Sequence, residues 1–190
     1  EYKKNAAKYV MLPGFAKGRH VEVEKSLQQL QEYAETTPLN RIEMNDTGLG
    51  IITSGVPYQY VKEAFPHASI LKLGLVNPLP QELIKSFAAQ VDKLFVVEEL
   101  EPVIEEQVKS WGIEVIGKDQ LTLLGEYSTE YLQQQLGGQP MPPGFNLDKQ
   151  VPARPPLLCA GCPHRGVFHA LRKMRLVVAG DIGCYTLGAI

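Results

Sequence analysis

Two cysteines three positions apart, Cys159 and Cys162, have the clearest chemical potential in the sequence, and His164 follows them at once. Thiols at this spacing can ligate one metal ion or iron-sulfur cluster. The pair precedes a predicted helix over residues 167–174, and a helix N-terminus offers free N–H groups and a positive potential that stabilise thiolate or phosphate. A zinc knuckle completed by a nearby histidine or by Cys184, a thioredoxin-like redox pair, and unligated thiols are the alternatives.

The third cysteine, Cys184, closes the segment Gly180-Asp181-Ile182-Gly183-Cys184, directly after a predicted strand over residues 176–179. In open α/β sheets ligands bind beyond the carboxyl ends of strands, and glycines let the backbone approach a ligand closely. Taken alone, the segment is most simply an ordinary turn. In a β-α-β unit, however, the helix N-terminus and the strand C-terminus lie at the same end, so we expect all three thiols to converge.

Composition excludes several classes of protein. The chain has 19 Lys and Arg against 21 Asp and Glu, a net charge of -2, and no block of one sign, so neither nucleic acid nor membrane is an expected partner. No apolar run approaches the roughly 20 residues that span a bilayer, and the first residues do not lead into a signal-peptide core. An odd number of cysteines argues against a secreted disulfide framework. We expect a cytoplasmic protein, and both ends suggest an internal fragment.

Four short apolar runs alternate with helical periodicity in the middle of the chain. They predict strands over residues 49–53, 70–73, 94–97 and 113–116. Such β-α alternation is typical of parallel strands joined by right-handed crossovers, with helices on both faces. We therefore predict one doubly wound α/β domain with a parallel sheet over residues 48–119.

The flanking segments differ in character. Residues 1–47 are expected to form a helical linker segment with an apolar stripe, and residues 120–156 a short helix and a proline-rich linker. Residues 157–190 then begin a second α/β domain, of which only the first β-α-β part is present.

Glu98 and Glu99 follow the third predicted strand, a position where ligands often lie. They are more simply explained as solvent-exposed acids that open the following helix, near its positive end. No residue in the sequence stands out as a general base.

The cysteine segments, together with their flanks, resemble the start of the thiamine-diphosphate domain of indolepyruvate ferredoxin oxidoreductases. These flanked segments are Pro155 to Gly166 and Gly180 to Gly188. Further upstream, four more segments resemble the middle of the same alpha, or large, subunit: Lys8 to Pro13, Pro38 to Arg41, Leu71 to Leu75 with Pro78 to Pro80, and Val97 to Pro102. The resemblance covers essentially the whole chain, and it implies that residues 48–119 are a transketolase C-terminal-like domain.

The resemblance implies an oxidoreductase that decarboxylates aryl 2-oxoacids such as indolepyruvate to the acyl-coenzyme A and carbon dioxide. Its expected cofactors are thiamine diphosphate, Mg²⁺ and a 4Fe-4S cluster, and its expected partners are a small beta subunit and ferredoxin, besides coenzyme A and the substrate.

Residue by residue, the resemblance assigns two overlapping sets. In the wider family, a Cys-x-x-Cys pair and a later Gly-Ile-Gly-Cys supply three cluster ligands, matched here by Cys159, Cys162 and Cys184. The residues expected to line the thiamine site are Gly161, Cys162, His164, Gly183 and Cys184. The fourth ligand and the Gly-Asp-Gly diphosphate motif are absent from this sequence, so we expect the chain alone to be inactive. A non-catalytic α/β docking module with a Cys/His zinc knuckle is the alternative.

Overall fold

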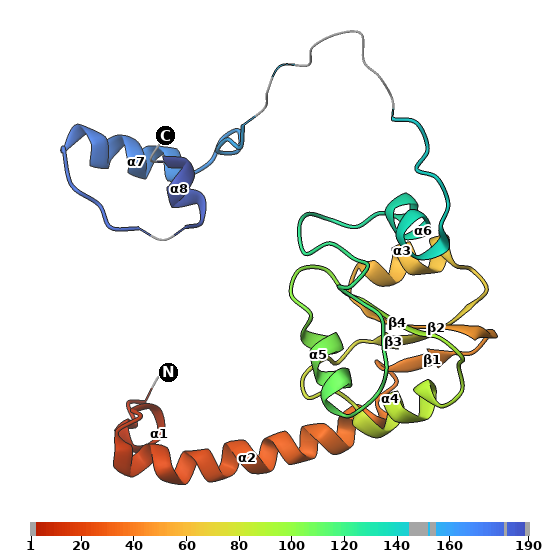
Figure 1. Ribbon diagram of the computed structural model, residues 1–190. Helices are drawn as coiled ribbons and strands as arrows, with labels where there is room; N and C mark the ends of the chain where they lie inside the picture. The colour runs from red at the N-terminus through yellow and green to blue at the C-terminus, as the bar shows by residue number, and fades with distance from the viewer. Residues whose placement is uncertain (1–2, 145–151, 153–154, 181, 189–190) are drawn as a thin grey trace. The chain divides into compact units, whose positions relative to one another are not determined.

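The computed structural model, which describes residues 3–144, 152, 155–180 and 182–188, contains a four-stranded sheet (Figure 1). The strands are β1 (Arg41–Glu43), β2 (Asp46–Ser54), β3 (Ala68–Leu73) and β4 (Leu94–Val97), in the order β1-β3-β2-β4. β2 pairs in parallel with both β3 and β4, so Ile51 faces Ile70 on one side and Phe95 on the other. The predicted parallel pairing is confirmed, and with it the α/β fold class.

Two details of the sheet differ from the prediction. β1 was not predicted, and it pairs antiparallel with β3, so the sheet is mixed rather than wholly parallel. The run over residues 113–116 forms no strand; a single parallel bridge joins Ile116 to Phe95. The backbone bonds from Val96 N to Ile116 O (2.9 Å) and from Ile116 N to Leu94 O (3.0 Å) hold this run against β4.

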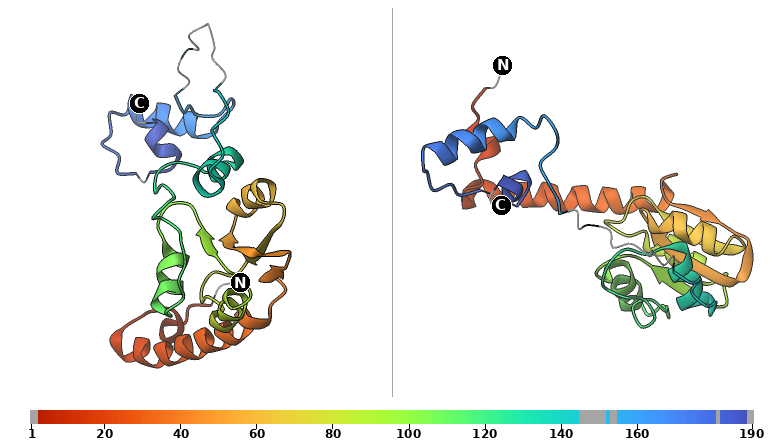
Figure 2. Two further views of the ribbon diagram at one scale, coloured as in Figure 1. Left: turned by 45° about the vertical axis from the view of Figure 1, so that its right-hand side comes forward. Right: turned by 90° about the horizontal axis from the view of Figure 1, so that it is seen from above.

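Helices cover both faces of the sheet. α3 (Pro57–Ala64) and α6 (Thr129–Gly137) lie on one face, and α4 (Gln81–Ala88) and α5 (Val103–Ser110) on the other (Figures 1 and 2). Alternate residues of each strand serve the two cores. Ile51, Ile70 and Phe95 are buried on the α3 side, whereas the next residue of each strand is buried on the α4 side: Ile52, Leu71 and Val96. Continuous apolar strands are typical of a sheet covered on both faces.

The N-terminal segment forms α1 (Ala6–Tyr9) and the long α2 (Pro13–Thr36), which extends past the sheet (Figure 2). Only its last turns contact the domain. Ala34 is buried, and Glu35 accepts hydrogen bonds from the backbone N–H groups of Glu82 (3.1 Å) and Leu83 (2.8 Å) at the start of α4. The predicted apolar stripe is otherwise exposed.

The chain divides into two compact units, residues 1–143 and residues 144–190, and the second is described by itself. Its described helices are α7 (His164–Lys173) and α8 (Cys184–Gly188). The predicted strand over residues 176–179 is not formed, and the side chain of Val177 is fully exposed. A strand requires a neighbour for its backbone hydrogen bonds, and none lies within the described part of this unit.

Among the residues that the structure describes, no helix combines the length and the apolar character that crossing a membrane requires.

Candidate functional site

The Cys-x-x-Cys segment folds into a tight turn directly before α7. Cys162 N donates to Cys159 O (3.1 Å), and the third residue of the turn, Gly161, has φ of +70°, a left-handed conformation that favours glycine. Arg165 fastens the turn from the helix side, since its guanidinium donates to Leu158 O (2.9 Å). Both thiols are therefore carried by one short, closed piece of backbone.

His164 is the polar neighbour of this turn. Its Nδ1 lies 3.4 Å from Cys162 Sγ, and both side chains are half-buried, whereas Cys159 is exposed. All three cysteines are free thiols. A thiolate and an imidazole are both ligands that zinc and iron accept.

The segment that carries Cys184 reaches the same helix turn through aromatic contacts. Tyr185, the residue after Cys184, packs edge-on against the ring of His164, with 5.8 Å between the ring centroids. Gly183 directly precedes Cys184, which is exposed at the start of α8. The structure thus brings together the two segments that the sequence singled out.

In the described residues, no group of three His, Cys, Asp or Glu side chains is arranged to hold a metal ion. Convergence of Cys159, Cys162 and Cys184 on one centre therefore stays a prediction. Gly161 and His164 are neighbours of Cys162 along the chain, and the roles predicted for them in a thiamine site also stay predictions. Asp181, within the segment that carries Cys184, is outside the described residues.

Side chains of the protein itself fill the space beyond the carboxyl end of β4. Glu98 is buried and accepts hydrogen bonds from the backbone N–H groups of Ile104 and Glu105, both at 2.9 Å, at the start of α5. The interpretation of Glu98 as solvent-exposed is wrong for this reason, although its place at a helix start was foreseen. Burial raises the pKa of the Glu98 carboxyl.

Lys118 contacts the same region at the end of β4. Its Nζ donates to Glu98 O and to the hydroxyl of Tyr127, both at 2.6 Å. Burial lowers the pKa of Lys118. Tyr127 in turn donates to Thr122 O (2.8 Å). The sequence carried no signal for this network, whose groups satisfy one another and so act in holding α5 and the 117–127 segment against β4.

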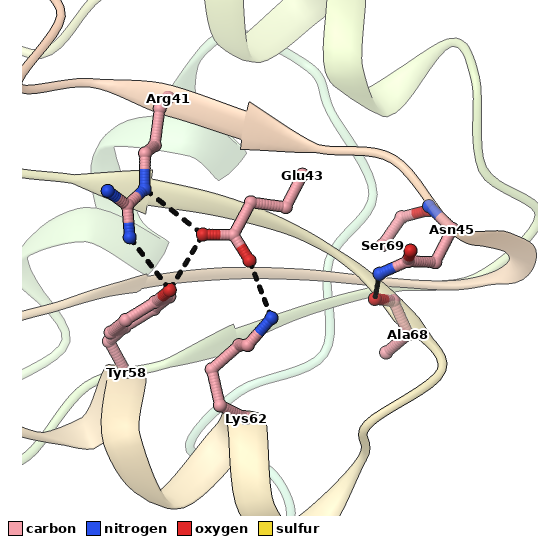
Figure 3. A network of polar contacts seen from close by, with 7 residues as sticks. All are labelled: Arg41, Glu43, Asn45, Tyr58, Lys62, Ala68 and Ser69. Carbon is pink, nitrogen blue, oxygen red and sulfur yellow. Dashed lines mark hydrogen bonds and ion pairs between the residues drawn. The ribbon is translucent and has the colours of Figure 1, made fainter.

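A second polar network ties the unforeseen edge strand β1 to α3 (Figure 3). Glu43 accepts hydrogen bonds from Arg41 Nε (3.0 Å), from the hydroxyl of Tyr58 (2.6 Å) and from Lys62 Nζ (2.7 Å). Arg41 Nη2 also donates to the Tyr58 hydroxyl (2.9 Å). One carboxylate between two cations anchors a three-residue strand that has little apolar surface of its own.

The fold is shared with the solved structure of an oxidoreductase. The 2-oxoglutarate:ferredoxin oxidoreductase from Magnetococcus marinus, with 2-oxoglutarate, coenzyme A and succinyl-CoA bound, superposes with a TM-score of 0.52. The match covers 67% of this chain and 24% of that chain at 17% sequence identity, so it establishes the fold. No family model matches the sequence.

Relatives with higher sequence identity narrow the class of enzyme that this chain resembles. Indolepyruvate oxidoreductase subunit IorA of Pyrococcus horikoshii is 38% identical over 100% of this chain, and that of Archaeoglobus fulgidus is 32% identical over 99%. The chain is thus a homologue of the IorA subunits along its whole length, which confirms the resemblance of its motifs. It spans about a third of the length of these relatives, 33% and 34% respectively.

Proposed function

We propose that this chain is a segment of the large subunit of a cytoplasmic indolepyruvate oxidoreductase. The enzyme converts an aryl 2-oxoacid and coenzyme A to the acyl-coenzyme A thioester and carbon dioxide, and the two electrons released pass one at a time to ferredoxin. The observation that carries the proposal is the match of the whole chain to relatives of that name at 30–38% identity. The shared fold with a 2-oxoacid:ferredoxin oxidoreductase supports it.

Bound thiamine diphosphate with Mg²⁺ supplies the electron sink that decarboxylation requires. In this chain, the donor chemistry fits an iron-sulfur cluster, because Cys159, Cys162 and Cys184 are free thiols and the first two share one turn. We assign all three as cluster ligands. Gly161 and Gly183 leave room for backbone to approach the thiamine diphosphate, and His164 orients Cys162 through its 3.4 Å contact.

The α/β domain of the first unit acts as a support. Ligands of open α/β sheets bind beyond the carboxyl ends of the strands. Beyond β4, Glu98 and Lys118 fill this position, and their hydrogen bonds are satisfied within the domain. We therefore place the reactive groups of this chain in the second unit. The small beta subunit and ferredoxin are the proposed protein partners.

The direct test uses the complete large subunit together with its small partner subunit, reconstituted with thiamine diphosphate, Mg²⁺ and iron-sulfur clusters. We expect ferredoxin reduction that requires both indolepyruvate and coenzyme A. The 190-residue chain under the same conditions is the matched control, and it should give no reduction because the diphosphate motif is absent from its sequence. Absence of turnover with every aryl 2-oxoacid in the complete enzyme would contradict the assignment.

Metal analysis separates cluster binding from the competing docking module with a zinc knuckle, which the contact between Cys162 and His164 also suits. In the complete subunit, alanine at Cys159, Cys162 or Cys184 should lower iron content and electron transfer while leaving the sheet of the first unit folded. Constant iron with weaker thiamine diphosphate binding would mean that the cysteines only line the cofactor site. A colourless zinc protein would support the docking module instead.

A further inference from the structure

Three aromatic rings of the second unit form one contact cluster, which we call the aromatic clasp: His164 and Phe168 of α7, and Tyr185 of α8. The ring of His164 stacks on Phe168 with a centroid distance of 6.0 Å. Tyr185 packs edge-on against both, at 5.8 Å from His164 and 5.8 Å from Phe168. All three separations lie in the range where aromatic rings attract one another in offset-stacked or edge-to-face geometry.

The end of α8 closes onto the same rings. A Cβ atom at Gly188 would lie 2.6 Å from the ring of Phe168, so the backbone of α8 approaches that ring as closely as a glycine allows. The clasp therefore connects α7 with a helix that begins eleven residues after α7 ends. Because α8 has only five residues, its own hydrogen bonds do not fix its position, and packing must do so.

Each side of the clasp carries a cysteine. On one side, His164 Nδ1 lies 3.4 Å from Cys162 Sγ. On the other, Tyr185 is bonded to Cys184 along the chain. We propose that the aromatic clasp is a positioning device that holds Cys184 beside the Cys159–Cys162 turn before any metal or cluster binds. Its value for cluster assembly rests on the proposed function, whereas the juxtaposition of the two segments does not.

Along the chain, 21 residues separate Cys184 from Cys162. Without the clasp, these residues would have to be ordered before the third thiol could join the pair. Ordering such a loop costs conformational entropy at the moment of ligand binding. With the clasp formed, that ordering has already taken place in the free protein, and the ligands need only close around the metal. Preorganisation of this kind strengthens binding without adding contacts.

The test is chemical cross-linking of the 190-residue chain, whose only three cysteines make every product assignable by peptide mass spectrometry. In a Cys159→Ser background, a short bismaleimide reports the Cys162–Cys184 pair alone. We expect the native chain to form this cross-link about tenfold faster than the same chain in urea, because a held pair has a higher effective concentration than the ends of a flexible loop.

Matched variants assign the effect to the rings. Tyr185→Ala and His164→Ala should lower the native rate to the rate in urea, and Tyr185→Phe should preserve it because the ring remains. His169→Ala is the control, since this exposed histidine lies on the same helix outside the clasp and its loss should leave the rate unchanged. Rescue by phenylalanine separates positioning by the ring from a general loss of folding.

Three results would overturn the proposal: a native rate no faster than that in urea, a Tyr185→Ala chain that cross-links like the parent, or a Tyr185→Phe chain that fails like Tyr185→Ala. The experiment contains no metal, cofactor or substrate, so its outcome is independent of the enzymatic assay. If the chain cross-links at the expected rate but the complete enzyme is inactive toward indolepyruvate, the proposed function alone is rejected. If the enzyme is active but the cross-linking rate is no faster than in urea, the clasp alone is rejected.

Discussion

Replacing Glu43 by glutamine should destabilise the first unit by removing the anion that joins β1 to α3. Its carboxylate is the acceptor for Arg41, Tyr58 and Lys62, at 3.0, 2.6 and 2.7 Å. Glutamine has nearly the same shape but only one acceptor oxygen, and its amide group would face a cation or a hydroxyl. The two cations would then lie close together without a compensating charge.

The magnitude follows from exposure. A hydrogen bond to a charged group contributes roughly 1.5–3 kcal/mol when shielded from water, whereas exposed ion pairs contribute about 0–1 kcal/mol. The Glu43 side chain is 22% exposed and Lys62 is 39% exposed, and Tyr58 is buried. The bond to Tyr58 therefore lies nearer the shielded limit and the pair with Lys62 nearer the exposed one. We expect a loss of about 2 kcal/mol in the free energy of unfolding at neutral pH.

The assay is denaturant unfolding followed by the fluorescence of Trp111, the only tryptophan of the chain, which packs against the core on the α4 side of the sheet. Glu32→Gln provides a matched control, because Glu32 is an exposed acid of α2. A surface substitution of this kind should change the free energy of unfolding by less than about 0.5 kcal/mol.

The pH dependence gives a sharper criterion. The hydrogen bond from Lys62, followed by that from Tyr58, lowers the pKa of Glu43 below its ordinary value of 4.5. A carboxyl whose pKa is lower in the folded state contributes stability that is complete above its unfolded pKa and is lost as the pH falls through the folded pKa. The difference between the parent and Glu43→Gln should therefore be constant near neutrality and shrink below pH 4.5. A difference under about 0.5 kcal/mol, or one that grows in acid, would refute this reasoning.

Three further substitutions test the packing of the same unit by the same assay. Gly50→Ala places a Cβ 2.6 Å from a methyl group of Val91 and should cost about 1–3 kcal/mol, which a second change, Val91→Ala, should partly relieve; equal stability of the single variant would contradict the close packing. Lys118→Met leaves Glu98 O and the Tyr127 hydroxyl without their donor and should cost about 2 kcal/mol, whereas no loss would mean that the network is replaceable by apolar contact. Glu98→Ala removes the acceptor for two N–H groups at the start of α5 and should cost about 1–2 kcal/mol, and an unchanged midpoint would show that solvent caps the helix equally well.

The parallel part of the sheet could be predicted because its strands are buried on both faces. Continuous apolar runs identify such strands, and residues 94–97 coincide with β4 while residues 49–53 and 70–73 lie inside β2 and β3. β1 escaped prediction since Arg41-Ile42-Glu43 is short and mostly polar. Pairing with β3, a charge network and the packing of one apolar residue, Ile42, hold it in place. The run at 113–116 was apolar for a different reason, as it packs beside β4 through one bridge.

The candidate site was predictable where its geometry is local. Gly161 at the third position of a four-residue turn explains why the Cys159 and Cys162 spacing folds as it does. The contact of Tyr185 with His164 joins residues 21 positions apart and depends on packing, so no sequence pattern predicts it. The strand over 176–179 failed for the complementary reason, because strand formation depends on neighbours as well as on apolar residues.

The activity proposed for the complete enzyme is the formation of a coenzyme A thioester from an aryl 2-oxoacid, and mass spectrometry of the product measures it most directly. The complete large and small subunits would be incubated with coenzyme A, oxidised ferredoxin, and either indolepyruvate or 2-oxoglutarate. We expect the thioester of indoleacetate from indolepyruvate, with one carbon dioxide released per thioester. A thioester formed with 2-oxoglutarate but not with indolepyruvate, or no thioester with either acid, would contradict the proposed activity.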